Sequence, residues 1–386
     1  MMKARDAIIV GGGPAGLAAA IALRLRGLDV LVAEALTPAI DKACGEGLMP
    51  DSRCELAKLG LELSPAAGVE FDGIHFSSGR RAAKESVTAE FPVGRGIGVR
   101  RIELHARMAE HARELGVELA WGARVGLKDG HPVQVNGEPA RYRYLIGADG
   151  QSSRVRQWAG LGNGNLVSRR FGLRRHYRVA PWSSNVEVHW GVRGQAYVTP
   201  VGENEVCIAT LTRVPGLTAD ALLEEMPMLQ TKLKAATLSS RPRGSLTTTR
   251  TLDRVTADGV ALIGDASGSA DAVTGEGLAI AFRQAVMLAD SISAGGLERY
   301  QAGHGAILKM PQTMARILLT MDRWPLLRHR AMRMLSGNPS IFAGMLGVHV
   351  GEESIRHFIQ RQGWQVATGL IAPASSTLDH AAVRLI

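Results

Sequence analysis

Apolar and polar positions in the first 34 residues follow the order strand, helix, strand. Residues 7–10 (AIIV) form a short, wholly apolar run, which is typical of a parallel strand buried on both faces. The segment LAAAIALRLRG predicts a helix that ends at Gly27, a residue suited to a helix C-cap. DVLVAE then predicts a second strand that ends at Glu34.

Two later segments repeat an apolar strand followed by a glycine-rich turn. They are YLIGADGQSSRVR at 144–156 and GVALIGDASGSADAVTGEGL at 259–278, and the second continues into the apolar helix LAIAFRQAVMLAD. A further helix is expected over 102–115. We assign these segments to the same domain as the N-terminal unit, which predicts a Rossmann-like α/β domain.

A different periodicity occupies the rest of the chain. Residues 69–91 and 170–212 alternate between apolar and polar positions, as antiparallel strands do, and we expect both to join one sheet that covers the substrate. From about residue 300 the pattern is helical. The predicted fold is therefore a two-domain α/β protein, with a mostly antiparallel substrate sheet and C-terminal helices. Residues 1–68, 95–168 and 246–300 form the nucleotide-binding domain; 69–94 and 169–245 form the sheet; 301–386 are helical.

The glycines between the first strand and helix have the spacing of a dinucleotide-phosphate loop. Gly11 makes the tight turn, Gly13 lets a pyrophosphate approach the backbone, and Gly16 lets the helix pack on the strand. Pro14 and Ala15 open the helix whose free N–H groups would hold the diphosphate. Glu34, followed by Ala35, ends the second strand, where a carboxylate accepts hydrogen bonds from ribose hydroxyls.

The amino-acid composition indicates which kinds of binding partner and which cellular compartment to expect. The formal charge is +9 and only 8 of the 45 basic residues are Lys, but the Arg residues are scattered, which favours a basic surface around an anionic cofactor over a nucleic-acid partner. The three cysteines (Cys44, Cys54 and Cys207) form no CxxC pair, and no His cluster has metal spacing, so we expect reduced thiols, no metal and a cytoplasmic protein. The N-terminal apolar run is too short for a signal peptide.

The three glycine-containing segments together resemble the FAD-binding motifs of the p-hydroxybenzoate hydroxylase superfamily of flavin monooxygenases, geranylgeranyl reductases and flavin-dependent halogenases. The resemblance covers roughly residues 5–300 and implies FAD as the cofactor. It implies that Gly11, Gly13 and Gly16 hold the pyrophosphate, Glu34 the adenosine ribose and Asp265 the ribityl chain. It further places Asp149 and Gly150 near the pyrophosphate, Arg101 (with Arg100 as the alternative) against FAD, and Val125 beside the adenine.

The turn TGEGL at 274–278 is expected to face the part of the flavin that becomes negative on reduction. Gly275 shapes the turn, while the N–H groups of Gly277 and Leu278 would supply positive charge from the helix N-terminus. Hydroxylases of this superfamily commonly have His and Pro where this chain has Gly268 and Ala272. TGEGL and CGEGL instead approach the geranylgeranyl reductases, and the halogenase motif Trp-x-Trp-x-x-Pro is missing from WGVRGQAYVTP.

Three functions stay open at this point. A flavin monooxygenase acting on an apolar aromatic, polyketide or lipid-like small molecule is our first expectation, and an ene-reductase of the geranylgeranyl type is the alternative. A flavin-binding subunit without turnover is the third. No second Rossmann unit is visible, so NAD(P)H would bind only transiently, unless a separate reductase or ferredoxin delivers the electrons.

Catalytic candidates are few, because flavin oxygenases often need little acid or base assistance. They are Glu276 beside the expected flavin turn, Tyr197 on the substrate sheet and Cys44 in CGEGL. We interpret His176 and His189 as hydrogen-bonded structural residues. The Met-rich face beyond residue 300 would cap the core, line an apolar tunnel, or contact a membrane surface or carrier protein.

Overall fold

A six-stranded sheet forms the core of the nucleotide-binding half in the computed structural model, which describes residues 3–78 and 85–371. Its strand order is β19-β20-β12-β1-β2-β8, and all neighbours are parallel except β19 and β20. Ala7, Ile8 and Ile9 of β1 are almost fully buried, as their apolar run predicts. The strands are β1 (Arg5–Val10), β2 (Val30–Glu34), β8 (Glu118–Trp121), β12 (Tyr142–Gly147), β19 (Thr256–Ala257) and β20 (Val260–Leu262).

Helices cover this sheet and bring distant segments together. Helix α1 (Pro14–Arg24) packs on β1 and β2, and both α3 (Arg101–Glu114) and α7 (Gly277–Ser293) pack against α1. The helix predicted at 102–115 is thus confirmed within one residue. Helices α2 (Pro50–Ala57) and α4 (Arg154–Trp158) complete this half, where α2 contacts α7.

A second, larger sheet forms the other half. It runs in the order β17-β13-β16-β15-β14-β5-β6, with β18 paired to β13. The prediction that segments near 69–91 and 170–212 share one sheet is confirmed by the pairing of β5 with β14, although that pair is parallel. The strands are β5 (Gly73–Ser78), β6 (Ser86–Glu90), β13 (Gly164–Arg178), β14 (Asn185–Trp190), β15 (Gly194–Gly202), β16 (Glu205–Thr212), β17 (Thr237–Leu238) and β18 (Arg243–Leu252).

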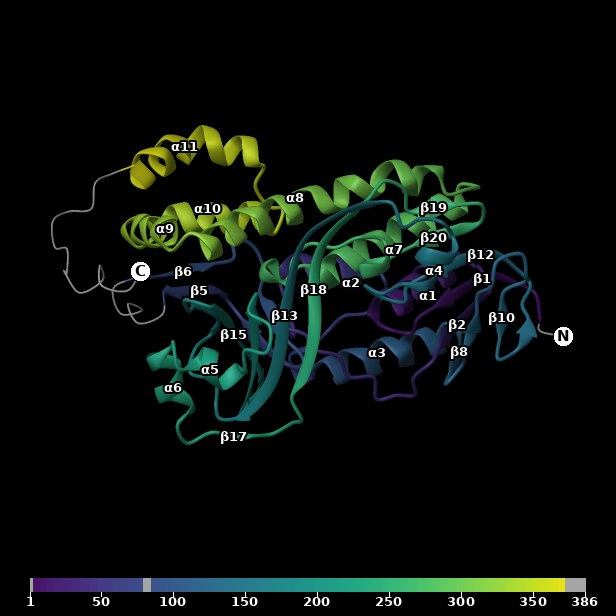
Figure 1. The fold of residues 1–386 in the computed structure, drawn as a ribbon, viewed down its shortest axis with the longest axis horizontal. Coiled ribbons are helices and arrows are strands. Elements are labelled where there is room, and N and C mark those ends of the chain that lie inside the picture. The colour runs from purple at the N-terminus through teal and green to yellow at the C-terminus, as the bar shows by residue number, and fades with distance from the viewer. Residues whose placement is uncertain (1–2, 79–84, 372–386) are drawn as a thin grey trace.

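Strands β13 and β18 connect the two halves. They run side by side as two long arcs from the region of α4 to the far end of the second sheet (Figure 1). Their ladder extends from the pair Gly164 and Leu252 to the pair Arg174 and Arg243, with one irregularity between Leu166 and Ser168. Short helices α5 (Ala219–Leu223) and α6 (Pro227–Leu233) follow β16.

Two small sheets complete the strands. β3 (Gly47–Leu48), β7 (Gly96–Gly98) and β4 (Val69–Phe71) form one, so the start of the segment predicted at 69–91 lies outside the large sheet. β9 (Val125–Gly126), β10 (Gln134–Val135) and β11 (Glu138–Pro139) form the other. Residues 79–84 of the predicted alternating segment, and the tail from residue 372, fall outside the described residues.

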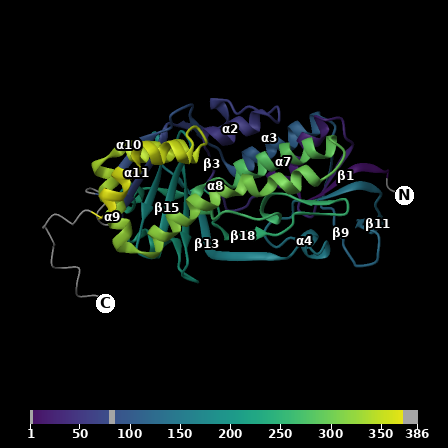
Figure 2. The same ribbon diagram turned by 90° about the horizontal axis from the view of Figure 1, so that it is seen from above.

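Helices at the C-terminal end cover the second sheet, as Figure 2 shows from above. They are α8 (Glu298–Arg323), α9 (Pro325–Gly337), α10 (Pro339–His349) and α11 (Ile355–Ile371). Helices α9 and α10 contact β6, α11 packs on α9 and α10, and α8 runs on alongside α7. Met314, Met321, Met332 and Met334 are buried in one core with Trp190 and Phe71 of the sheets, as the core-capping interpretation of the Met-rich face expects, and Met314 also lines a cavity. Within the described residues no helix is long and apolar enough to cross a bilayer.

Candidate functional site

One cavity of about 1040 Å³ extends from the carboxyl ends of β1, β2 and β12 to the underside of the C-terminal helices. Ligands of open parallel sheets bind at this edge. Almost all cofactor-binding residues expected from the sequence line it: Gly11, Gly13, Pro14, Ala15, Glu34, Ala35, Arg101, Val125, Asp149, Gly150, Asp265, Gly275, Gly277 and Leu278. The exception is Gly16, which is buried beneath the loop.

The three loop glycines have different physical roles. Gly11 has φ +109°, and a Cβ there would lie 2.5 Å from the carbonyl oxygen of Ala148. A Cβ on Gly16 would lie 1.9 Å from the carbonyl oxygen of Gly11, so this glycine permits the contact of α1 with β1. A Cβ on Gly13 would meet nothing closer than an Arg101 nitrogen at 3.9 Å. Gly13 therefore leaves open space where a pyrophosphate fits against the helix N-terminus.

The geometry favours Arg101 over Arg100 as the anion-binding arginine. Arg100 forms an ion pair with Glu205 (2.6 Å), whereas Arg101 lines the cavity near Gly13. The Nε atoms of both arginines are buried without a hydrogen-bond partner in the described structure, but only Arg101 lines the cavity, and burial lowers the pKa of its guanidinium. A bound anion would supply the missing partner.

Glu34 occupies the position expected of a ribose-binding carboxylate. Its two oxygens accept hydrogen bonds from the backbone N–H groups of Gly12 (2.7 Å) and Leu36 (2.8 Å). A carboxylate has about four acceptor sites, so capacity for hydroxyl donors remains. The carboxylate is thereby held in place at the end of β2.

The Asp149 and Asp265 segments are tied together by an arginine that sequence reasoning missed. Asp149 accepts from the N–H groups of Arg154 and Val155 and so caps α4, while its other oxygen is buried without a partner. Arg156, itself buried, donates to the carbonyl of Ala266 (3.0 Å). Arg156 therefore positions both aspartate turns, and only its place in the fold identifies it.

The TGEGL turn opens onto the cavity, but Glu276 does not. Gly275 has φ +72° and lines the cavity together with Gly277, the first residue of α7. Glu276 is 1% exposed and is not among the residues that line the cavity; its carboxylate lies instead near His349 of α10 and the Asp51 carboxylate of α2. Glu276, a catalytic candidate because of its place beside the flavin turn, therefore lies behind that turn and can act on the cavity only through its neighbours.

The far half of the cavity is apolar. The sheet contributes Ile74, Phe76 and Val188, and the helices contribute Met314, Leu318 and Phe342. Tyr197 lines the same space, but its hydroxyl donates to the carbonyl of Val273 (3.1 Å), and burial raises the pKa of the phenol well above its usual range. Tyr197 therefore joins the sheet to the flavin turn and is poorly suited to proton transfer.

Cys44 lies on the cavity wall where the two halves meet. Its Sγ accepts a hydrogen bond from the N–H of Glu46 (3.4 Å), a residue with φ +61°. Cys44 thus remains a candidate for contact with cofactor or substrate. The sequence interpretation did not single out its neighbour Glu46, which also lines the cavity.

Glu46 belongs to a buried polar network that reaches the substrate sheet. The Glu46 carboxylate lies 2.6 Å from His176 Nε2 and accepts a hydrogen bond from the backbone N–H of Arg101 (3.0 Å). The other ring nitrogen of His176, Nδ1, lies 2.9 Å from a guanidinium nitrogen of Arg174. Because Arg174 can only donate, Nδ1 accepts, and the Nε2–H is therefore donated to Glu46. The Cys207 thiol lies close enough to Glu46 and His176 that the three side chains could together ligate a metal ion. However, the positive charges of the nearby Arg101 and Arg174 guanidiniums disfavour binding of a cation there.

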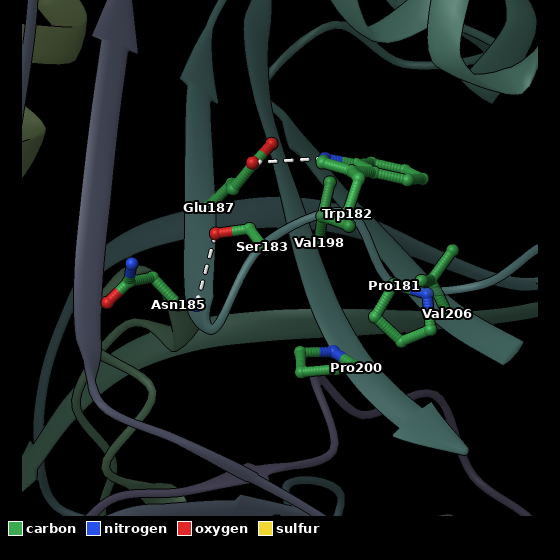
Figure 3. Close-up of a pocket in the computed structure, with 8 residues that line it drawn as sticks. All are labelled: Pro181, Trp182, Ser183, Asn185, Glu187, Val198, Pro200 and Val206. Carbon is green, nitrogen blue, oxygen red and sulfur yellow. Dashed lines mark hydrogen bonds between the residues drawn. The ribbon is translucent and has the colours of Figure 1, made fainter. Parts of the chain in front are cut away.

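Figure 3 shows a second recess, between Pro181, Trp182 and Glu187 on the outer side of the sheet. Trp182 Nε1 donates to Glu187 (3.0 Å) at its edge. The recess measures about 10 Å³, the space of about one water molecule. It is too small for an organic ligand, so the large cavity is the better candidate for the functional site.

Comparison with known proteins agrees with this geometry. The FAD binding domain family matches residues 4–195. A menaquinone reductase of Mycobacterium tuberculosis is 28% identical, over 76% of this chain and 78% of its own length. Digeranylgeranylglycerophospholipid reductase 1 of Methanopyrus kandleri is 30% identical, over 77% of this chain and 84% of its own length. The chain belongs to this family of FAD-dependent oxidoreductases.

Further similar proteins and solved structures show how much of this chain the similarity covers. Rifampicin monooxygenase of Streptomyces venezuelae is 37% identical, but over only 40% of this chain and 34% of its own. Among solved structures, a flavin-dependent brominase has a TM-score of 0.75 at 18% identity, covering 94% of this chain and 99% of its own. A geranylgeranyl bacteriochlorophyll reductase-like protein of Thermoplasma acidophilum has a TM-score of 0.72 at 19% identity, covering 95% and 100%. These structures confirm the predicted fold class.

The residues present fit FAD. The open space at Gly13, the unpartnered Arg101 Nε and the cavity-facing Asp265 suit the diphosphate and polyol portions, and the TGEGL turn suits the flavin end. When bound, FAD supplies electron-pair transfer. The chain itself orients the cofactor, excludes water through the apolar half of the cavity and sets the local charge.

Proposed function

We propose that this FAD-dependent oxidoreductase is a reductase that saturates a carbon–carbon double bond in a long, isoprenoid-like substrate. The observation that carries the proposal is the continuity of the cavity from the TGEGL turn to Met314, Leu318 and Phe342. Such a lining suits an extended hydrocarbon better than a compact polar substrate. It also keeps water from the reacting atoms.

The extent of the sequence likeness supports the same choice. Two relatives named as reductases match about three quarters of this chain and more than three quarters of their own length. The compounds in their names, menaquinone and digeranylgeranylglycerophospholipid, both carry long isoprenoid chains. The similarity to rifampicin monooxygenase spans only 168 residues. A monooxygenase of a lipid-like molecule is the second candidate, since that family also shares the FAD-binding segments.

The test separates the two reactions by product mass. FAD-loaded protein, reduced with dithionite under argon, is mixed with menaquinone or a geranylgeranyl phospholipid, and NADH and NADPH are tried as alternative donors. Reduction adds two hydrogen atoms without O₂. A product that gains ¹⁸O only when ¹⁸O₂ is admitted would support the oxygenase and contradict the reductase.

Blocking the apolar half of the cavity should lower turnover without loss of FAD. Leu318 is buried and lines the cavity, so Leu318→Trp fills the space of the substrate chain, and we expect turnover to fall at least about tenfold. The neighbouring Ile317 is 42% exposed, so Ile317→Trp is the matched control and should retain activity. FAD content is checked by absorbance. Equal turnover of the two variants would contradict this use of the cavity.

We further propose that the junction of α8 and α9 contacts an anionic membrane surface on the cytoplasmic side. Trp324 and Leu326 are 59% and 81% exposed there, and the Arg323 guanidinium lies 5.9 Å from the Trp324 ring centre. Arg330 is exposed on the next turn. Exposed aromatic and aliphatic side chains among arginines suit the headgroup region of an anionic bilayer.

This contact predicts vesicle binding that depends on lipid charge. We expect the protein to co-sediment with phosphatidylglycerol vesicles more than with phosphatidylcholine vesicles, and Trp324→Ser with Leu326→Ser to remove most of the binding. Leu25→Ser changes an exposed leucine at the end of α1, in the nucleotide-binding half, and should have no effect. If the double substitution left vesicle binding unchanged, the proposed membrane contact would be contradicted, and contact with a carrier protein would be the alternative.

A further inference from the structure

A buried cluster of ionisable groups lies directly beneath the TGEGL turn. Glu276 Oε2 is 3.6 Å from His349 Nδ1, and neither atom has a hydrogen-bond partner among the described residues. On the other side of Glu276, Asp51 of α2 pairs with Arg283 of α7 (2.5 Å), and Arg283 also lies 3.6 Å from Glu55. Two unpartnered polar atoms facing each other in a buried site require an explanation.

The contacts of His349 determine where a proton can be. Its Nε2 lies 3.1 Å from the carbonyl oxygen of Thr274. A carbonyl only accepts, so Nε2 carries hydrogen and the neutral imidazole presents a bare Nδ1 to Glu276. An anionic Glu276 would then face a lone pair in a buried site, which is unfavourable. A proton held between the two atoms removes the conflict.

The charge balance of the cluster favours a shared proton. Burial, together with the neighbouring Asp51 carboxylate, raises the pKa of Glu276 to about 8. Burial lowers the pKa of His349, although Asp51 acts in the opposite direction. Near neutral pH the pair therefore consists of a protonated Glu276 and a neutral His349, which titrate as one unit.

The pair is also placed to sense charge on the cofactor. Gly275 and Gly277, the residues on either side of Glu276, both line the cavity, and so does His349. The N-terminus of α7 at this point suits negative charge on the bound group. Added negative charge beside the pair favours its protonated state.

We propose that Glu276 and His349 form a redox-linked proton site, which at alkaline pH, where the pair has lost its proton, takes up a proton from solvent when the bound FAD is reduced. Under those conditions a two-electron donor gives two electrons to the cofactor with one proton, and a second proton binds between Glu276 and His349. Asp51, Arg283 and Glu55 set the pH at which this occurs. Both residues are positioning residues that act through the charge of the site. The proposal depends on FAD binding and is independent of the substrate.

Proton uptake on reduction tests the proposal. The FAD-loaded protein is photoreduced under argon in weakly buffered solution with a pH indicator, and protons taken up per electron pair are counted. Near pH 9 the oxidised pair has lost its proton, so reduction should take up about one proton more in the wild type than in Glu276→Gln. Near pH 6.5 the pair holds its proton in both redox states, and the two proteins should agree.

The control is Glu352→Gln, the same change at an exposed carboxylate three residues after His349, which should behave as the wild type. Identical proton counts for wild type and Glu276→Gln at both pH values would overturn the proposal. Failure to bind FAD would be visible in the absorbance spectrum and would concern the family assignment instead. Failure to reduce isoprenoids would leave the proton count unaffected.

A second measurement needs no cofactor reduction. Because folding raises the pKa of Glu276 from 4.5 to about 8, the folded state binds the extra proton between these values, so its stabilising effect is lost as pH rises. The Tm of the wild type should therefore fall relative to that of Glu276→Gln between pH 5 and pH 8. The ¹⁵N shifts of His349 should show a neutral ring with hydrogen on Nε2. An imidazolium at pH 7 would contradict the assignment.

Discussion

The substitution Gly13→Val is expected to produce a folded protein that no longer binds FAD. A Cβ on Gly13 would clash with nothing in the described structure, and φ is −71°, a value that valine adopts without strain. The added methyl groups would instead occupy the space for the pyrophosphate above the N-terminus of α1. We expect FAD affinity to fall at least about 100-fold, since close backbone approach at this glycine is what the phosphate requires. Fluorescence titration of the apoprotein with FAD measures the change.

Two other glycine variants serve as controls that separate loss of the phosphate site from a general effect of a larger side chain or from unfolding. Gly162→Val changes an exposed glycine with open space around it and should bind FAD normally. Gly16→Ala places a Cβ 1.9 Å from a backbone oxygen and should lower the Tm strongly as well as FAD binding. If Gly13→Val bound FAD with unchanged affinity, the pyrophosphate would have to lie elsewhere.

Arg170→Met is expected to cause the largest loss of stability. The Arg170 side chain is fully buried on β13, where it pairs with Asp271 (3.2 Å) and donates to Gln195 (2.6 Å), while Asp322 of α8 lies at 3.8 Å. Removal of the guanidinium leaves the buried Asp271 carboxylate without its cation, whereas Asp322 keeps Arg213 at 3.3 Å. The free energy of unfolding should fall by about 3–5 kcal/mol, measured by urea denaturation.

A matched variant lies on the same strand. Arg175 pairs with Asp220, whose side chain is 70% exposed, so Arg175→Met should cost only about 0–1 kcal/mol. The double variant Arg170→Met with Asp271→Asn should recover part of the loss, because one unpaired charge is removed. Equal stability of Arg170→Met and Arg175→Met would show that the buried ion pairs contribute little.

Local patterns predicted most of the cofactor cradle. Gly11, Gly13 and Glu34 lie within 24 residues, and their spacing alone carries the geometry of strand, turn and helix. The structure brings the Asp149 and Asp265 segments to the same edge because β12 and β20 are neighbours in the parallel sheet. Parallel strands with apolar sequences end at one edge, so this convergence follows from pattern.

The network around Glu46 could not be predicted in the same way. Glu46 and His176 are 130 positions apart, and their contact depends on how the second sheet docks against the cradle. Glu276 and His349 similarly meet only because α10 folds back onto the TGEGL turn. Each of these side chains, taken alone, is an ordinary polar residue. Long-range packing, which has no periodic signal in the sequence, determines their roles.

The continuous ladder of β13 and β18 restricts the motions by which substrate and product can enter and leave the cavity. Because the ladder runs through both halves of the molecule, a hinge opening between the halves would break consecutive backbone hydrogen bonds in its middle, close to the buried Arg170. The scaffold around the cavity therefore behaves as a rigid frame. We therefore expect substrate and product release to depend on motion of the side chains and C-terminal helices around the cavity more than on domain motion.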